Sequence, residues 1–207
     1  MRQTYLSWCA FALAGLLATG NVHAFGLGGS LGFGAESWDY ETNYQEDRTL
    51  GHVSFVLDTH LSQSRLFNYR FTLGQETSEA DNNGLTMSGV MMTHSFGFRI
   101  VGRDRFRLWV GPQLKVTTYD TLEDDTSNDY DGVVLGIGFG PVVGFNLNFG
   151  KVVTLSFTGG LRATSYYVDY DVYSGTGSYQ GYSDLDADAT GSFLDVSLIF
   201  RIGEHGY

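Results

Sequence analysis

The odd and even positions of residues 132–149 differ in character. Over the stretch GVVLGIGFGPVVGFNLNF the odd positions hold large apolar residues or proline, and every even position holds glycine, valine or asparagine. A period of two is that of a β-strand, whereas a helix would scatter the same residues around its axis. The repeated glycines and the central Pro141 would also weaken a helix. The stretch is uncharged and long enough for a spanning helix, but its pattern predicts a strand.

Seven other segments have strand character, and none has a helical period. The eight predicted strands cover approximately residues 26–40, 49–60, 65–76, 85–100, 105–120, 132–148, 151–172 and 189–203. One face of these strands is apolar and the other carries Gly, Ser, Thr and charged residues, although the fourth segment, GVMMTHSFGF, is the least regular. In the fifth segment, for example, Leu108 and Val110 alternate with Arg107 and Trp109. The pattern predicts an all-β, antiparallel fold of eight strands.

The connections between these segments alternate in length and charge. The first, third, fifth and seventh are long and acidic: ETNYQEDR, ETSEADNNG, TLEDDTSNDYDG and SGTGSYQGYSDLDADA. The other three are short, and Arg65, Arg103, Arg105 and Lys151 cluster there. An up-and-down sheet would gather the long connections at one end and the short ones at the other. Long outer loops and short inner turns are typical of bacterial outer-membrane barrels.

Two barrel types fit this alternation. A soluble, lipocalin-like barrel turns its apolar face inward, and an outer-membrane barrel turns it outward. Glycine on the polar face favours the membrane barrel, because the interior of an eight-stranded barrel is crowded. Aromatic residues near strand ends would form interfacial girdles: Tyr40, Tyr119, Phe149, Tyr166, Tyr167 and Tyr170. We therefore predict an eight-stranded antiparallel up-and-down transmembrane β-barrel, closed so that no backbone group is left unpaired.

The last predicted strand adds a family resemblance. Gly191 is followed by apolar residues at alternate positions up to Phe200, although the chain runs on from Arg201 to Tyr207. This is similar to the C-terminal signal that the barrel assembly machinery reads. With the strand pattern, the chain resembles the small outer-membrane β-barrel family, the OmpA/OmpX-like transmembrane barrels, through pattern and not through a diagnostic motif. The resemblance implies a monomer in the outer membrane of a Gram-negative bacterium, in contact with its lipids and lipopolysaccharide.

The N-terminus predicts export. Arg2 precedes an apolar run from Trp8 to Ala18, and Val22-His23-Ala24 is a small-x-small ending typical of a signal peptide cleaved after Ala24. The mature barrel domain would then cover residues 25–207 and contain no cysteine, because Cys9 lies in the signal. A formal net charge of −11 argues against nucleic acid as a partner.

Strand parity places several charged residues inside the barrel. We expect a lumen ionic network of Glu36, Asp58, Arg70, Arg99, Arg107, Lys115, Arg162, Asp195 and Arg201, with His52 and His60 on the same face. Such charges could line a polar gate, but buried charges must be paired, which favours a structural network that fills the lumen. We expect Arg162 to bridge Glu36 and Asp195, and Asp58 to meet Arg99, Arg107 or Arg201.

Two of three His–Ser arrangements are similar to part of the His-x-Ser-Asn motif of the lipid A deacylases. His52-x-Ser54 and His60-x-Ser62 lack the Asn, and His94 and Ser95 are adjacent and therefore face opposite sides. His52 and Ser54 share the lumen face, away from a lipid substrate. We therefore expect no catalytic residues in this barrel.

The acidic loops carry one candidate cation site. Asp184-x-Asp186-x-Asp188 could hold Ca²⁺, but it lacks the following Gly and the distal Glu of an EF-hand loop, so a solvated acidic loop is favoured. No cofactor is expected. The sequence predicts a non-enzymatic outer-membrane barrel that serves surface interaction or membrane integrity. The alternatives are a narrow channel for small solutes or ions and a lipid A-modifying hydrolase.

Overall fold

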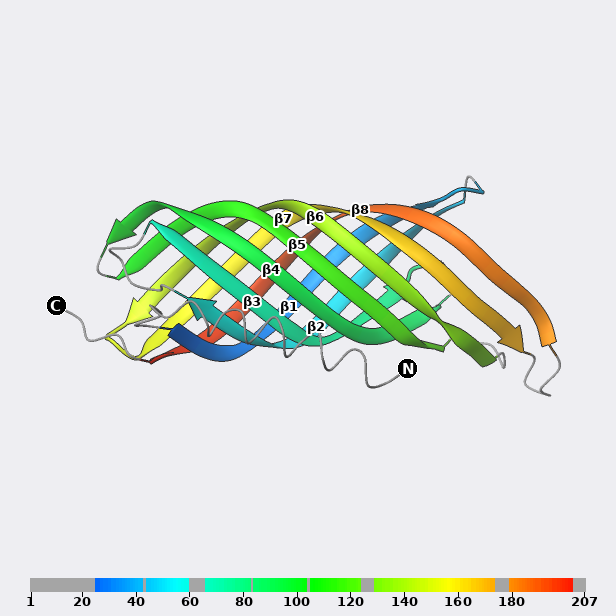
Figure 1. Ribbon diagram of the computed structural model, residues 1–207, viewed down its shortest axis with the longest axis horizontal. Coiled ribbons are helices and arrows are strands. Elements are labelled where there is room, and N and C mark those ends of the chain that lie inside the picture. Colours follow the sequence, from blue (N-terminus) through cyan, green and yellow to red (C-terminus); the bar gives the residue numbers. More distant parts are fainter. Residues whose placement is uncertain are drawn as a thin grey trace, which may run out of the picture.

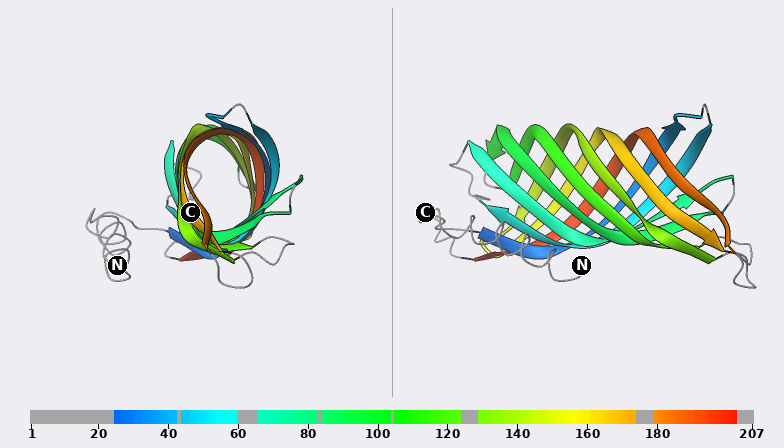
Figure 2. Two further views of the ribbon diagram at one scale, coloured as in Figure 1. Left: turned by 90° about the vertical axis from the view of Figure 1, so that its right-hand side faces the viewer. Right: turned by 45° about the vertical axis from the view of Figure 1, so that its right-hand side comes forward.

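The computed structural model is a closed barrel of eight antiparallel strands, as the alternation predicts (Figure 1). It describes residues 25–202 apart from 43, 60–65, 83, 104, 124–128 and 174–178, and only the backbone at 129–131, 170, 172–173 and 179–185. The strands are β1 Phe25–Tyr40, β2 Gln45–Thr59, β3 Phe67–Ala80, β4 Thr86–Arg103, β5 Phe106–Glu123, β6 Asp129–Phe149, β7 Val153–Tyr173 and β8 Tyr179–Ile202. Each strand pairs with the next, and β8 pairs with β1. The end-on view shows the closed ring (Figure 2). The described residues contain no helix long and apolar enough to cross a membrane.

Inward-facing side chains fill the barrel, and the glycines of β6 make room for them. Trp109 and Gly144 are cross-strand partners, and a Cβ on Gly144 would lie 2.0 Å from the Trp109 ring. A Cβ on Gly136 would likewise lie 2.4 Å from the Tyr166 ring. Both aromatic side chains are almost fully buried. The crowded interior that glycine on the polar face predicts is confirmed at these two positions.

Two expectations about the strand ends are wrong. β8 begins at Tyr179 and pairs with β7 through most of the predicted seventh loop, so that loop is much shorter than the sequence suggested. Tyr119 and Tyr166 do not belong to an interfacial girdle, because both point inward and are buried. Tyr167 and Phe149, in contrast, are exposed on the outside.

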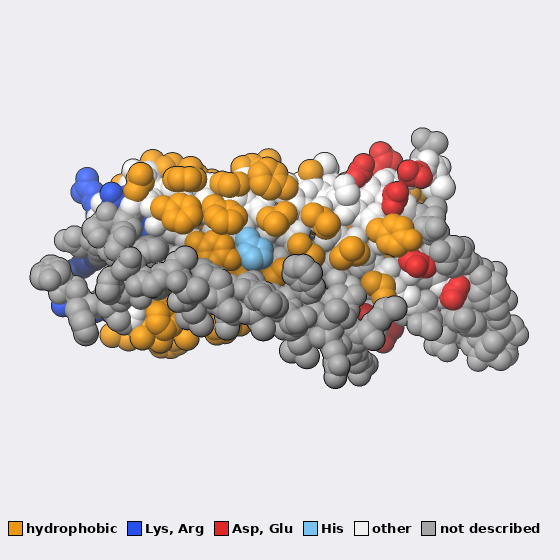
Figure 3. Space-filling view, viewed as in Figure 1, with side chains coloured by type: hydrophobic (Ala, Val, Ile, Leu, Met, Phe, Trp, Pro, Cys, Tyr) orange, Lys and Arg blue, Asp and Glu red, His pale blue; other side chains and the backbone are white. Residues whose placement is uncertain are grey.

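The outer surface is divided along the barrel axis. A broad band of apolar side chains covers the part nearer the short turns, and acidic side chains gather at the other end (Figure 3). Phe33, Val53, Phe139, Leu161 and Leu194 are each more than half exposed in this band. Basic side chains lie at the short-turn end (Figure 3). An apolar band on the outside that surrounds a polar interior is the arrangement of a barrel embedded in lipid.

Candidate functional site: the charged interior

The interior charges lie in successive layers, and the layer nearest the short turns holds an arginine–aspartate pair. Arg70 Nη2 lies 2.5 Å from Asp58 Oδ2, and Nε of the same guanidinium lies 2.8 Å from that oxygen. Arg70 also donates to Thr158 Oγ1 at 2.6 Å and to Ser156 Oγ at 2.9 Å. Its guanidinium carbon lies 5.3 Å from the centroid of the Trp109 ring. The cation is therefore held by a charge, two hydroxyls and an aromatic face.

The ionic partner that the structure shows for Asp58 is Arg70, which was not among the arginines expected. Asp58 and Arg70 are direct cross-strand partners on β2 and β3, so their side chains meet on the inner face. Arg99 and Arg201 lie only half-buried near the short-turn end. Arg107 is fully buried on β5. The register of the β2–β3 pair therefore decided the partner.

Arg107 and Arg201 bond to neutral oxygens close to the short turns. Arg107 Nη2 donates to Asn68 Oδ1 at 3.2 Å, inside the barrel. Arg201 donates to the carbonyl oxygen of Gly150 in the β6–β7 turn. These two hydrogen bonds hold the short-turn end together.

In the middle layer, His52 and Asp195 meet across a glycine. In register, His52 and Asp195 both lie beside Gly32, on either side of β1. His52 Nε2 lies 3.2 Å from Asp195 Oδ1. A Cβ on Gly32 would lie 2.0 Å from the imidazole and 2.4 Å from the carboxylate oxygen. The missing side chain is what allows strands β2 and β8 to share a contact inside the barrel.

The next layer uses the same arrangement for Glu36 and Arg162. Both residues lie beside Gly191 in register, and Arg162 Nη2 reaches Glu36 Oε1 at 3.3 Å. Arg162 does not reach Asp195, which lies four residues nearer the short turns on β8 and contacts His52 instead. Tyr166 donates to Glu36 Oε2 at 2.7 Å.

Opposite this group lies a second acid–base pair that the sequence analysis missed. Lys115 Nζ lies 2.6 Å from Glu76 Oε1, and Tyr119 donates to the same oxygen at 2.6 Å. All three side chains are buried. Glu76 shares the parity of Arg70 on β3, which was the available signal, but it stands at the start of the acidic run ETSEAD and was assigned to the strand end.

Toward the long connections the interior becomes apolar. Arg48 contacts Glu46 and donates from Nε to Ser78 Oγ at 2.8 Å, a buried group that the sequence analysis placed in the first acidic loop. Beside it lies a cluster of buried side chains, the outer cluster. It comprises Trp38, Met87, Tyr119, Leu122, Val134, Tyr166, Val168, Ala187 and Ala189. Tyr166 stacks on Trp38 with ring centroids 3.9 Å apart. The outer cluster occupies the barrel above the charged layers.

Comparison with known proteins bears on the architecture. No protein-family model and no curated protein sequence matches the chain. The solved structure of outer membrane protein OprG from Pseudomonas aeruginosa superposes with a TM-score of 0.56 at 8% identity, covering 86% of this chain and 95% of that chain. The chain has the fold of the small outer-membrane β-barrels. Neisserial surface protein A matches with a TM-score of 0.43 at 9% identity, over 84% of this chain and 97% of that chain. Ail of Yersinia pestis matches with a TM-score of 0.34 at 11% identity, over 86% and 98%.

The His–Ser arrangements take separate positions in this outer-membrane barrel fold. His52 contacts Asp195, and Ser54 is buried on the same inner face, away from the outer surface. His94 points outward and lies 2.5 Å from the Tyr69 hydroxyl, whereas Ser95 points inward and accepts a hydrogen bond from Gln113. His60 and Ser62 lie outside the described residues.

The candidate Ca²⁺ motif does not form a loop in this barrel. Asp184, Asp186 and Asp188 lie at alternate positions of β8, paired with β7. Asp186 and Asp188 are exposed on the outer face, and Asp188 Oδ1 accepts a hydrogen bond from Ser165 at 2.7 Å. The side chain of Asp184 lies outside the described residues. Within the part of the chain that the structure describes, no group of three His, Cys, Asp or Glu side chains could hold a metal ion.

Proposed function

We propose that this chain is a non-enzymatic barrel of the bacterial outer membrane whose interior is closed and whose acidic end serves interaction at the cell surface. The observation that carries the proposal is the pairing of charges inside the barrel beneath the outer cluster. Buried ion pairs in a narrow barrel act as filling, because side chains can occupy the whole interior of eight strands. The apolar band on the outside supports the location in lipid.

Single-channel recording in planar bilayers tests the closed interior. We expect the native protein to show no steady conductance of the size that porins give. Asp195→Ala, which frees His52 inside the barrel, should raise the frequency of brief openings. The matched control is Asp188→Ala, which removes an outward carboxylate from the same strand and should leave the trace unchanged. Steady porin-sized conductance from the native protein would overturn the proposal.

A narrow channel is the second candidate function, and one observation favours it. A small interior void of about 10 Å³ lies between the middle charged layers, lined in part by His52, Thr93, Gln113, Arg162 and Asp195. A void of this size holds about one water molecule. A path for small ions would have to pass through it, so the recording above distinguishes the two candidates.

The hydrolase alternative is tested separately. The inward position of His52 and Ser54 supports a role in filling the barrel. Mass spectrometry of lipid A from cells with and without the protein should give the same species. Loss of a deacylated species in cells that carry His52→Ala or Ser54→Ala would make the chain a lipid A-modifying enzyme.

The expected partners follow from the proposed location. We propose that the barrel assembly machinery inserts the chain as a monomer, and that its apolar band contacts outer-membrane lipids and lipopolysaccharide. A folded sample should migrate faster on an SDS gel before heating than after heating. Recovery of the mature chain as a detergent-free periplasmic protein would contradict the location.

A further inference from the structure

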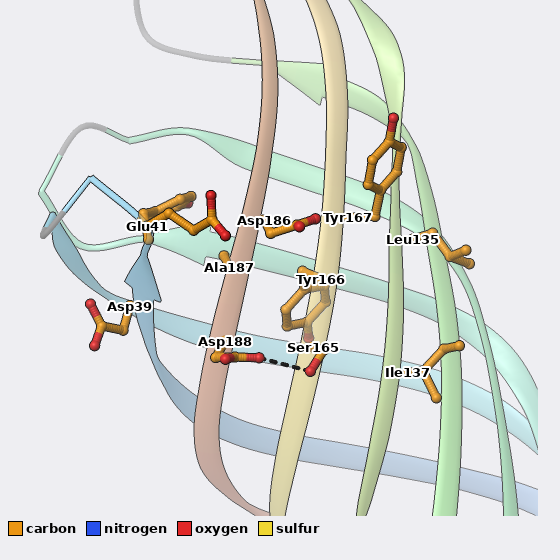
Figure 4. A pocket seen from close by; sticks show the side chains of 11 residues that line it. Asp39, Glu41, Leu135, Ile137, Ser165, Tyr166, Tyr167, Asp186, Ala187 and Asp188 are labelled. Atoms are coloured by element: carbon orange, nitrogen blue, oxygen red, sulfur yellow. Dashed lines mark hydrogen bonds between the residues drawn. The ribbon is translucent and has the colours of Figure 1, made fainter.

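A hollow lies on the outer face of the barrel beyond the apolar band, over β6, β7, β8 and the end of β1 (Figure 4). Its volume is about 630 Å³. Leu135, Ile137 and Tyr167 form an apolar wall, and each is at least 40% exposed. Ser165 of β7 lies at the bottom of the hollow, and its small side chain leaves space between β6 and β8. The hollow is large enough for several side chains of a partner.

The side of the hollow opposite the apolar wall is acidic. Asp39, Glu41, Asp186 and Asp188 line it, and all are exposed (Figure 4). The cross-strand register produces this division, because the row that starts at Ile137 runs through Ser165 and Asp188 to Asp39. The hollow therefore changes from apolar to acidic across the strands.

The acidic side is not neutralised by the residues around it. Asp39 and Asp188 are directly opposite each other on paired strands and share the outer face, an arrangement in which like charges repel. The described residues that line the hollow include no lysine or arginine. Ser165 donates a hydrogen bond to Asp188, but its hydroxyl is uncharged and does not cancel the charge of the carboxylate. A cationic group from a partner would relieve this repulsion.

A second hollow of about 890 Å³ lies beside the first on its short-turn side. Arg48 and Arg162 also line it, and each is paired with a glutamate inside the barrel. The row Ala163, Thr190 and Ser37 lies directly beside the row of Ser165, Asp188 and Asp39 on the same three strands. Its small side chains are bordered by Phe139, Pro141 and Leu161 of the apolar band. The two hollows together have room for a short extended segment and not only for a single side chain.

We propose that these hollows dock a cationic amphipathic peptide segment. Its lysine or arginine side chains would lie between the carboxylates of β1 and β8, and its apolar side chains against Leu135, Ile137 and Tyr167. The phosphate of an anionic lipid has the wrong charge for the acidic side, which favours a peptide. The inference rests on the proposed surface location, because a peptide outside the cell reaches this end only if the barrel lies in the outer membrane.

Fluorescence anisotropy with the mature barrel in non-ionic detergent tests the proposal. The probe is a fluorescein-labelled peptide of alternating lysine and leucine residues, and a lysine–serine peptide of equal charge shows what the apolar wall adds. We expect saturable binding of the lysine–leucine peptide and at least about fivefold weaker binding of the lysine–serine peptide. Absence of saturable binding, or equal binding of the two peptides, would overturn the proposal.

Two double variants locate the binding. Asp39→Asn with Asp188→Asn should weaken the lysine–leucine peptide by about tenfold, since two charge contacts are lost. The matched control is Glu79→Gln with Asp120→Asn, which removes the same charge from exposed positions on β3 and β5 outside the hollows. It should change binding by less than about twofold. Equal weakening by the two double variants would show general attraction to an acidic surface and would overturn the docking site.

A third variant fills the second hollow without a change in charge. Ala163→Trp should weaken peptide binding while the heat-dependent gel shift shows that the barrel is folded. Unchanged binding would place the peptide elsewhere and overturn the proposal. Displacement of the peptide from the native barrel by lipopolysaccharide, with direct lipopolysaccharide binding that Asp39→Asn and Asp188→Asn also weaken, would make a lipid the occupant. Because these measurements use purified protein, their failure does not affect the proposed outer-membrane location, which the periplasmic fractionation tests.

Discussion

Carboxylates on one strand meet opposite conditions inside and outside this barrel. On β1, Glu36 points inward, is buried and lies 3.3 Å from Arg162. Three residues further along, Asp39 points outward, is exposed and lies opposite Asp188 of β8. The inner carboxylate has a cation beside it, and the outer one has another carboxylate.

The difference follows from the surroundings of each charge. Inside, the effective dielectric constant is low and an unpaired charge is costly, so Glu36, Asp58 and Glu76 each lie within 3.3 Å of an arginine or lysine nitrogen. Outside, water and salt screen the repulsion between carboxylates. A charge inside therefore needs a partner within the barrel, whereas a charge outside remains available to a partner from solution.

The largest effect is expected when a fully buried carboxylate loses the cation with which it is paired. Arg70→Met should lower the free energy of unfolding by about 3–5 kcal/mol, because it removes the cation that pairs with the buried Asp58. Urea unfolding of the barrel in lipid vesicles measures this. Arg105→Met, at an exposed position in the β4–β5 turn, is the control and should change the free energy by less than about 0.5 kcal/mol. A loss below about 1 kcal/mol for Arg70→Met would mean that interior pairing is not required.

A smaller loss is expected where charges are shared. Glu76→Gln should cost about 1–3 kcal/mol, because Lys115 keeps other polar neighbours in the layer that holds Glu36 and Arg162. A double-mutant cycle between Glu36 and Glu76 should give a coupling of about 0.5–3 kcal/mol. The same cycle between Asp58 and Glu76 should be additive within about 0.5 kcal/mol, because Asp58 lies in the layer nearest the short turns. Equal coupling in both cycles would contradict separate layers.

The glycines between paired side chains provide a third test. Gly32→Ala would place a Cβ 2.0 Å from the His52 imidazole and should cost about 1–3 kcal/mol by overpacking. Gly51→Ala is the control, because nothing lies within 4 Å of its Cβ position. That substitution should be neutral or stabilise the strand by up to about 1 kcal/mol in the same urea experiment. Similar losses for both variants would mean that the His52–Asp195 contact does not depend on the missing side chain.

The sequence predicts the faces of the strands better than the contacts between them. Alternation is a local property, so the inward positions of Arg70, Lys115 and Arg162 could be read from one strand at a time. Partners depend on the register between strands, which closure of the whole barrel fixes. The pairing of Asp58 with Arg70 and of Asp195 with His52 therefore could not be derived locally.

The missed segments have a common physical cause. Beyond the apolar band the outer face of a strand is polar and the inner face packs in the outer cluster, so the pattern of apolar residues outside and polar residues inside is lost. The first part of β8 from Tyr179 therefore resembles a loop, and Glu46 and Arg48 at the start of β2 were placed in one. Glu76 was missed for a related reason, because an acidic run after it suggested the end of β3.

The smallest effect is expected on the outside, with the opposite sign. Asp188→Asn removes one of two facing carboxylates, so it should raise the free energy of unfolding by up to about 0.5 kcal/mol at low ionic strength. The gain should shrink at about 1 M salt, because screening already weakens the repulsion there. Glu79→Gln, an exposed carboxylate on β3, is the matched control and should not show this salt-dependent gain. Destabilisation by Asp188→Asn would mean that the hydrogen bond from Ser165 outweighs the repulsion from Asp39. If the gain is found together with weaker peptide binding, then Asp39 and Asp188 lower the stability of the barrel while they favour binding of a partner. The paired carboxylates of the interior have the reverse role.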